Sequence, residues 1–576
     1  MLSYRKLAMC VLGRPLHTGG GIDSPRPASQ RAAAFILTAA MLTTLAAPAF
    51  AEIWYIEDGN ITISAGTEAG TNKVEQAGKD TVDNDKDTII TNQNKDKASS
   101  NTVTIDAGSD KVEVKLDNVN IKADSGSALT SKGDVTLALN GDNHLTGGIS
   151  GTGNYGRNGI ASTGSLTISG GENDSLTAQG GSGADGSYGG HGIYSNGSLT
   201  ISGGTVNATG GDGSNVNGSG ISSNGSVTIS GGTVTANGGN GGNVSGDGIR
   251  SNSSVAIFGG TVKAAGGDGS DGGSGISSSS GVTVSDGTVT ANGGNGGNVS
   301  GDGIRSDGGV TISGGTVKAA GGDSKDGYGG DGIRSGGGVA ISGNTVNAAG
   351  GNGGKVGGYG ICSFDRVAIS GGTVEAAGGS SGSSNGGSGI YSNDIDLSGS
   401  LELTAKAGSP NGKALSQKGS ELDLDTIKDK LGPGAKVTAT DADGKVIDQV
   451  PIPRPVEPEE SSSSSDGGSA APSAPAFSLP GLTVTDKDGQ RISYTSTQSG
   501  NTLTVCVGRL TASFRISLAA LRQLRAEGIE TITFQTILCS TTLSLDELLA
   551  MGGEDAEVVL THHIRFSTLT VGGKAV

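Results

Sequence analysis

The sequence predicts an all-β parallel β-helix, or β-solenoid, followed by a small α+β domain. A phrase of about 28 residues, G-I-x-S…V-T-I-S-G-G-T-V-x-A-x-G-G, recurs through the middle of the chain. Its short segments alternate apolar and polar residues, which is typical of β-strands, and no segment of the repeat has a helical period. A fixed period of this length indicates stacked units that bury their apolar faces only against their neighbours.

The repeat is anchored by nine isoleucines that lie 27 to 33 residues apart: Ile160, Ile193, Ile221, Ile249, Ile276, Ile304, Ile333, Ile361 and Ile390. Looser copies around Leu129 and Leu415 extend the series. In each unit the anchor, the Val and Ile of V-T-I and the Val and Ala of T-V-x-A share one side, and such small or β-branched residues suit a narrow stacked interior. Three strands and three corners per turn predict rungs about 4.8 Å apart.

Glycine makes up 108 of the 576 residues, and such a content also occurs in collagen-like and disordered chains. Glycine does not fall at every third position here, and Val and Ile return in register, so the pattern favours an ordered solenoid. Glycine pairs such as Gly231-Gly232 and Gly238-Gly239 fall at the corners, where we expect positive φ angles.

Residues 1–51 have the pattern of a secretion signal: Arg26 and Arg31 precede an apolar run that ends in Ala49-Phe50-Ala51. Removing its five basic residues and one aspartate would change the formal net charge from −17 to −21. So acidic a chain is a poor partner for nucleic acid or anionic membrane and is compatible with cations. No other run is apolar enough to span a bilayer. We expect a secreted or cell-surface protein.

The chain divides into segments of different composition. We expect an N-terminal cap and first rungs over residues 52–128, and the repeats with a C-terminal cap over 129–450. Solenoid ends need such atypical units, because an open end exposes unpaired backbone groups. A Pro/Glu-rich and then Ser-rich linker is expected over 451–475.

A separate domain is expected over residues 476–576, and its role is not predicted. Cys506 and Cys539 either form a disulfide there or are separate buried thiols. The elements expected are strands at Leu482–Thr485, Arg491–Thr495, Thr502–Val507, Ser513–Ile516, Thr531–Gln535 and Val558–His562, and helices at Leu518–Glu527 and Leu545–Met551, the second with Ser544 as N-cap.

One outward column is the candidate binding site. The residue after each anchor reads Ala161, Tyr194, Ser222, Arg250, Ser277, Arg305, Arg334, Cys362 and Tyr391. Stacked guanidinium groups flanked by tyrosines would recognise an extended polymer that carries carboxylates, so Arg250, Arg305, Arg334, Tyr194 and Tyr391 are the predicted carbohydrate-binding residues. The alternative is that each arginine pairs with the acid three residues before it in D-G-I-R, which would leave only a solvated salt-bridge row.

A second column at the glycine-rich corner carries the candidate metal ligands. It reads Asp212, Asn240, Asp268, Asn295, Asp323, Asn352 and Ser380. Stacked oxygens of Asp212, Asp268 and Asp323 would hold Ca²⁺ between rungs. Asp and Asn also occupy such corners for purely conformational reasons. A third column on the V-T-I-S strand hints at ice binding, but Ala256, Ala340 and Ala368 interrupt its threonines.

Catalysis has little support in the sequence. No histidine has metal-ligand spacing, and the pair His562-His563 is expected at the surface. The G-x-S-x-G strings at 378–382 and 382–386 lack the strand–elbow–helix context of a nucleophile. A β-helix polysaccharide lyase that uses the acids and arginines of D-G-I-R remains an alternative.

The run Val112–Gly148 and the G-x-G-I-x-S-x-G-x-V-T-I-S-G-G-T-V repeats after it resemble a clostridial-type carbohydrate-binding β-helix family, over about residues 53–420. The resemblance implies a right-handed parallel β-helix, secreted or attached to the cell surface, that binds calcium and acidic polysaccharides such as polygalacturonate without catalysis. It assigns no individual ligand residue, because these rungs are nearly uniform.

Taken together, these patterns predict an exported, non-catalytic protein that binds a polysaccharide, with a uronate-containing polymer as the candidate ligand and Ca²⁺ as cofactor. The alternatives are a structural or adhesive surface rod and, less favoured by the sequence, a lyase. No oligomeric state is predicted.

Overall fold

The computed structural model describes residues 52–150, 155–183 and 188–451, and residues 482–575 with gaps at 487–489, 493, 500, 508, 510, 537–539, 552–555 and 563–566. The expected signal segment and all but the first residue of the expected linker lie outside the described residues. Among the described residues, no helix is long and apolar enough to cross a membrane.

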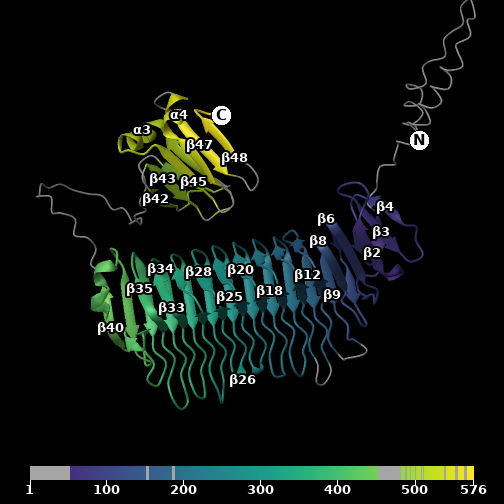
Figure 1. Cartoon of the computed structure of the whole chain (residues 1–576), viewed down its shortest axis with the longest axis horizontal. Coiled ribbons are helices and arrows are strands. Elements are labelled where there is room, and N and C mark those ends of the chain that lie inside the picture. The colour runs from purple at the N-terminus through teal and green to yellow at the C-terminus, as the bar shows by residue number, and fades with distance from the viewer. Residues whose placement is uncertain are drawn as a thin grey trace, which may run out of the picture. The chain divides into compact units, whose positions relative to one another are not determined.

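The middle of the chain is a β-solenoid of about 14 turns that follow one another about 28 residues apart, as predicted (Figure 1). One sheet combines the I-x-S and V-T-I segments of every rung. Its repeat strands are β10 (Ile160–Ser162), β11 (Leu166–Ser169), β13 (Ile193–Ser195), β14 (Leu199–Ile201), β16 (Ile221–Ser223), β17 (Val227–Ile229), β19 (Ile249–Ser251), β20 (Ser254–Ile257), β23 (Ile276–Ser278), β24 (Gly281–Val284), β27 (Ile304–Ser306), β28 (Gly309–Ile312), β30 (Ile333–Ser335), β31 (Val339–Ile341), β33 (Ile361–Ile369) and β35 (Ile390–Leu397).

A second parallel sheet stacks the T-V-x-A segments. Its strands are β7 (Asn120–Lys122), β9 (Asp142–Thr146), β12 (Ser175–Gln179), β15 (Thr205–Thr209), β18 (Thr233–Asn237), β21 (Thr261–Ala265), β25 (Thr288–Asn292), β29 (Thr316–Ala320), β32 (Thr345–Ala349), β34 (Gly372–Ala377), β36 (Leu401–Lys406), β39 (Lys436–Thr440) and the antiparallel β40 (Val446–Pro451). The third side is a row of glycine-rich loops joined by single bridges and by the pair β22 (Gly269–Asp271) and β26 (Gly296–Val299).

The interior is built from the predicted inward set. Ile304, Val310, Ile312, Val317 and Ala319 of one rung are all at most 2% exposed, and the same holds rung after rung. Each inward side chain is covered by its equivalents in the two adjacent rungs. Apolar surface is therefore buried along the whole stack, and this burial stabilises it.

A buried serine follows each anchor by two residues and also points inward. Ser335 is fully buried, and its Oγ donates a hydrogen bond of 2.7 Å to the carbonyl oxygen of Gly308 in the preceding rung. The hydroxyls of Ser223, Ser251 and Ser363 donate to the preceding rung in the same way, at 2.6 to 2.9 Å. This ladder satisfies carbonyls at a tight corner, where a strand pairing is interrupted.

The two glycine corners differ in their physical cause. Gly232 has φ +77°, as expected, and Asn344 takes the equivalent position with φ 65°, a region that asparagine tolerates. Gly238 and Gly239 do not have positive φ, contrary to expectation. A Cβ on Gly238 would lie 1.9 Å from the carbonyl oxygen of Gly246, so this corner needs glycine because two backbone segments touch.

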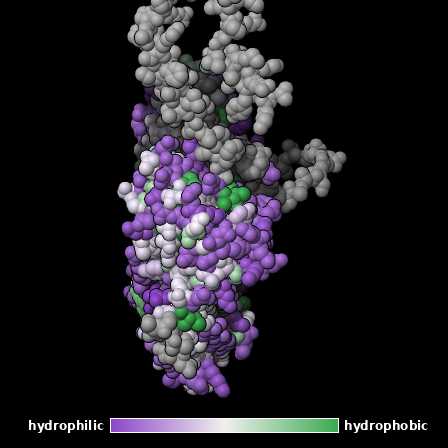
Figure 2. Space-filling model, turned by 90° about the vertical axis from the view of Figure 1, so that its right-hand side faces the viewer, coloured by the Kyte–Doolittle hydropathy of each residue, from purple (hydrophilic) through white to green (hydrophobic). Residues whose placement is uncertain are grey.

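Both ends of the stack are closed by irregular pairing. At the N-terminal end, β2 to β4 pair antiparallel; the elements here are β1 (Ile53–Tyr55), η1 (Ile56–Asp58), β2 (Ile61–Ala65), β3 (Asn72–Gln76), β4 (Val82–Asp85), β5 (Ile89–Thr91), β6 (Val103–Asp117) and β8 (Leu129–Asn140). At the C-terminal end lie β37 (Leu415–Gln417), β38 (Ser420–Glu421), η2 (Leu424–Thr426) and η3 (Lys428–Lys430). From the end that carries β2 to β4, the coloured surface is largely hydrophilic with scattered hydrophobic residues (Figure 2).

The C-terminal region has its own buried core and contains both strands and helices, as predicted. Two sheets form it, of five and four strands. Its elements are β41 (Leu482–Thr485), β42 (Thr495–Ser499), β43 (Thr502–Cys506), β44 (Ala512–Ser517), α3 (Leu518–Ala526), β45 (Thr531–Gln535), β46 (Ser540–Ser544), α4 (Leu545–Ala550), β47 (Glu557–His562), β48 (Ser567–Val571) and β49 (Lys574–Ala575).

Two details of that region differ from the sequence analysis. Of the strand expected at Arg491–Thr495, the described residues show only a single antiparallel bridge from Arg491 to Thr485; Ser493 lies outside them, and β42 begins at Thr495. His562 is fully buried, not at the surface, and its ring nitrogens lie 3.1 and 2.9 Å from Thr536 Oγ1 and Thr541 Oγ1. Ser544 does cap α4. Cys506 is half-buried, and Cys539 lies outside the described residues, so the predicted alternatives of a disulfide or two separate thiols stay open.

Candidate functional site

The predicted arginine column is in register along the first sheet. Arg250 aligns with Ser277, Ser277 with Arg305, and Arg305 with Arg334. All three guanidinium-bearing side chains are outward and 41 to 56% exposed. The β-solenoid therefore brings together three residues that lie up to 84 positions apart in the chain.

A groove of about 750 Å³ runs beside this column. The exposed arginines line one side. The other side carries half-exposed apolar residues of the glycine-rich loops, namely Val244, Val299 and Tyr328. Between them lie the buried carboxyl groups of Asp302 and Asp331 and the largely buried one of Asp247, which form the floor.

The floor carboxylates are held by the backbone of the next rung. Asp247 Oδ1 accepts from Ser274 N, Asp302 Oδ1 from Asp331 N, and Asp331 Oδ1 from Tyr359 N, each at 2.7 Å. Other acceptors occupy the same column elsewhere: Asn158 Oδ1 accepts from His191 N at 2.8 Å, and His191 Nδ1 from Ser219 N at 2.9 Å. Burial lowers the pKa of His191 to about 4, so it is neutral and able to accept at neutral pH.

Burial also dominates the electrostatics of the acids. It raises the pKa of Asp247 and of Asp302, and together with the neighbouring Asp302 it raises the pKa of Asp331 to about 7. Asp302 and Asp331 lie on adjacent rungs with only one hydrogen-bonded peptide between them. Near neutral pH Asp331 therefore holds its proton part of the time, because two buried carboxylates this close cannot both ionise without cost.

The alternative interpretation of the arginines, pairing within D-G-I-R, holds for two of the three. Arg250 lies 3.7 Å from Asp247 and Arg334 lies 3.4 Å from Asp331. Arg305 instead lies 4.0 Å from Asp307. Among the described residues, no basic side chain lies within ion-pair distance of Asp302, whose Oδ2 also has no hydrogen-bond partner there.

The predicted tyrosines lie outside the groove lining. Tyr194 is two rungs before Arg250, stacks on His191 with a centroid distance of 5.7 Å, and accepts a hydrogen bond from Asn224. Tyr391 stacks on Tyr359 at 4.9 Å, and Tyr359 does line the groove. Cys362, between Arg334 and Tyr391 in the column, is 1% exposed although its position faces outward.

Sequence reasoning missed the apolar side of the groove. Its residues each stand five positions before an anchor isoleucine: Val244, Val299, Tyr328 and Val356. Neighbouring rungs outside the groove carry Tyr188 and Val216 at this offset, and the rung between Val244 and Val299 carries the charged Asp271. Apolar residues at a constant offset inside a glycine-rich loop were the available signal. An exposed apolar patch rimmed by polar residues is typical of an interaction site.

The predicted calcium column is an asparagine and aspartate ladder. Asp212 Oδ1 accepts from Asn240 N at 2.7 Å, Asp268 Oδ1 from Asn295 N at 2.6 Å, and Asp323 Oδ1 from Asn352 N at 2.6 Å. The intervening asparagines accept from the next rung in turn. No three His, Cys, Asp or Glu side chains among the described residues gather as a metal site would require. Calcium at these corners stays a prediction.

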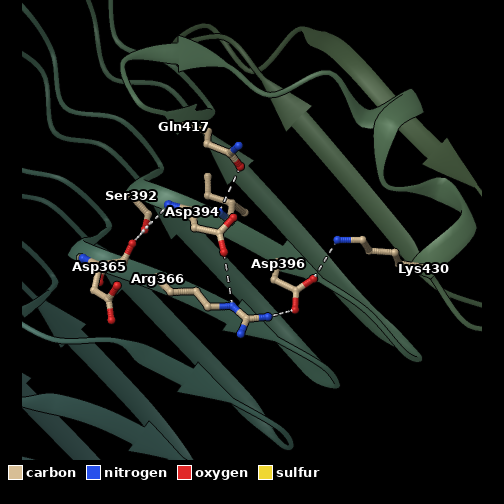
Figure 3. Close-up of polar contacts among 9 residues, drawn as sticks. Asp365, Arg366, Ser392, Asp394, Asp396, Gln417 and Lys430 are labelled. Atoms are coloured by element: carbon tan, nitrogen blue, oxygen red, sulfur yellow. Dashed lines mark hydrogen bonds and ion pairs between the residues drawn. The ribbon is translucent and has the colours of Figure 1, made fainter.

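A second charged cluster lies at the C-terminal end of the solenoid and is internally paired (Figure 3). Arg366 of β33 reaches Asp394 and Asp396 of β35, and Lys430 of η3 lies 3.4 Å from Asp396. The side-chain oxygen of Gln417 accepts a hydrogen bond from the backbone N–H of Ile395 in β35. These contacts join the last rungs to the C-terminal cap, so we assign them to stability.

Comparisons of the chain with protein-family models, with curated proteins and with solved structures found no match.

Proposed function

We propose that this protein is a non-catalytic polysaccharide-binding β-solenoid whose groove binds one extended glycan chain along the axis of the stack. The groove itself is the observation that carries the proposal. It is continuous over the rungs from Val244 to Tyr359, with hydrogen-bonding groups on one side and apolar groups on the other. Sugar rings present hydroxyls at their edges and C–H groups on their faces, which such a cleft complements.

The repeat explains why the ligand should be a polymer. Equivalent side chains return along the groove at the rung spacing of about 4.8 Å or its multiples. A chain of similar sugars can then make similar contacts at successive rungs, each weak alone and additive together. A small ligand would use only a fraction of the lining.

The test is a binding titration of the full chain against a panel of soluble polysaccharides. The variant is Arg250→Ser, Arg305→Ser and Arg334→Ser together, because Ser222 and Ser277 already occupy this column. We expect at least a tenfold loss of affinity, the scale of one lost hydrogen bond to a charged donor. The control is Lys263→Thr with Lys318→Thr, which removes positive charge from the second sheet, where Thr235 and Thr290 are equivalent residues. Equal affinities of both variants would refute the proposal.

We also propose Ca²⁺ as a cofactor of glycan binding, which a separate experiment tests. If the corner acids hold Ca²⁺, chelation should reduce glycan binding, and the triple change Asp212→Asn, Asp268→Asn and Asp323→Asn should reproduce that loss. Asparagine already accepts the ladder hydrogen bond at Asn240 and Asn295, so the variant keeps this contact. Binding that is indifferent to chelation would remove calcium from the account.

Cleavage of the bound glycan is a second candidate, favoured by one observation. A carboxyl group with pKa about 7 beside a second carboxyl in a groove suits proton transfer near neutral pH. Prolonged incubation with each bound polysaccharide, followed by an assay for new reducing ends, tests it. New ends that disappear in Asp331→Asn would favour an enzyme; intact polymer would favour a binding protein. A surface rod without a glycan ligand is the remaining alternative and predicts no binding in the panel.

A further inference from the structure

We infer that the chain bound in the groove is neutral, and that the carboxylate floor, above all Asp302, excludes uronate-rich polymers. This inference rests on the proposed function and names the class of its ligand. The arginine column alone predicts a polymer that carries carboxylates. The structure adds a floor of aspartates, which the sequence did not reveal.

The charge balance of the groove is negative. Its lining holds three guanidinium groups, those of Arg250, Arg305 and Arg334. Against them stand five carboxyl groups, those of Asp247, Asp271, Asp302, Asp307 and Asp331. Even with Asp331 protonated, four carboxylates stand against three cations. A polymer that carries a carboxylate on every sugar would meet net repulsion along this floor.

The cations are also engaged. Arg250 and Arg334 lie within 3.7 Å of floor aspartates, and the guanidinium carbon of Arg334 lies 5.3 Å from the ring centroid of Phe364. An incoming carboxylate would have to compete with these partners. A hydroxyl needs only one free N–H of a guanidinium group, which has five.

Asp302 is the strongest acceptor left free in the floor. It is 6% exposed, one oxygen accepts from Asp331 N, and no basic group is within ion-pair distance among the described residues. An acceptor-only carboxylate in a cleft binds sugar hydroxyls, which donate, and repels a sugar carboxylate, which cannot. The half-exposed Val299 and Tyr328 opposite offer contact to the apolar face of an uncharged ring.

The chain itself supplies the matched substitution for a test. Asn158 stands in the Asp302 column and accepts the equivalent hydrogen bond from the next rung at 2.8 Å. Asp302→Asn should therefore keep the ladder contact while removing the charge. Asp326→Asn changes an exposed aspartate outside the groove and is the control for net charge.

The experiment titrates the full chain with a neutral glucan, a neutral xylan and polygalacturonate, at low and at high salt. We expect the parent to bind a neutral polymer with little salt dependence and polygalacturonate at least tenfold more weakly. Asp302→Asn should strengthen polygalacturonate binding about three- to tenfold, the scale of one charge about 8–10 Å away in a partly solvated cleft. It should leave neutral binding within about twofold, and Asp326→Asn should change neither.

A parent that prefers polygalacturonate, or an Asp302→Asn change that alters both classes equally, would overturn the inference. If the parent prefers polygalacturonate but the triple arginine variant loses that binding, the groove is the site and only the ligand class is wrong. If no polymer binds, or the triple variant binds as the parent does, the proposed function fails and this inference fails with it.

Discussion

Replacing Asp331 by asparagine should remove a large part of the pH dependence of solenoid stability. The carboxyl group is 4% exposed, and burial beside Asp302 raises its pKa from 3.8 to about 7. The folded state therefore keeps a proton over this interval that the unfolded state releases. By linkage, this group's contribution to stability is fully present below about pH 4 and is lost as the pH rises through about 7.

The shift of about three pH units corresponds to at most about 4 kcal/mol, since each unit is worth about 1.4 kcal/mol. Part of the shift comes from repulsion by Asp302, which interacts with Asp331, so this figure is an upper bound. Asparagine resembles the protonated acid and is already accommodated in this column at Asn158. We therefore expect the variant to match the parent near pH 4 and to exceed its free energy of unfolding by about 2–4 kcal/mol at pH 8.

The assay is urea unfolding of parent and variant, followed by circular dichroism, at pH values from 4 to 8. Asp326→Asn, an exposed change in the same rung, is the control and should give the parent's curve. Parallel pH profiles of the parent and Asp331→Asn would refute the reasoning, because the buried carboxyl would then titrate as an ordinary one.

Three further changes test the fold. Ser335→Ala should cost about 1 kcal/mol, because Ser335 Oγ donates to the carbonyl oxygens of Gly308 and Gly338, each of which keeps a backbone donor. Ser131→Ala, in the same column but without a hydrogen-bond partner for its hydroxyl, should be nearly neutral in the same unfolding assay. Deleting residues 233–287 should leave a folded rod two rungs shorter, since Thr288 then takes the place of Thr233; loss of cooperative unfolding would count against the stack. Ile304→Ala should cost about 2–5 kcal/mol at a fully buried position, while Lys318→Thr on the outer face should cost little; equal thermal shifts would contradict the assignment of faces.

The repeat made the stack predictable because its physical cause is local and periodic. An inward side chain contacts the same side chain one period later, so alternation within a rung and identity between rungs both appear in the sequence. Ile304 beneath Ile333, and Arg305 beneath Arg334, follow directly from the period. The strand expected at 491–495 differs from β42 in its boundaries, because a small two-sheet domain has no repeat to fix them.

The groove was harder to predict than the column beside it. Its floor depends on Asp302 and Asp331 being buried, and D-G-I-R as a sequence gives no sign of burial. Its second side depends on how the glycine-rich loops double back, which Gly238 and Gly246 allow by backbone contact without positive φ. Tyr328 and Val299 recur at a fixed offset, so the signal existed, but within loops that offset does not say which way a side chain points.

The most direct test of the central claim is hydrogen–deuterium exchange of the full chain with and without the polysaccharide that binds best in the panel. Bound glycan should slow exchange in the groove segments 244–250, 299–305 and 328–334, and leave the second-sheet segments 261–265 and 316–320 unchanged as an internal control. Protection confined to the second sheet, or none in any of the groove segments while the glycan is bound, would contradict the assignment of the groove as the binding site.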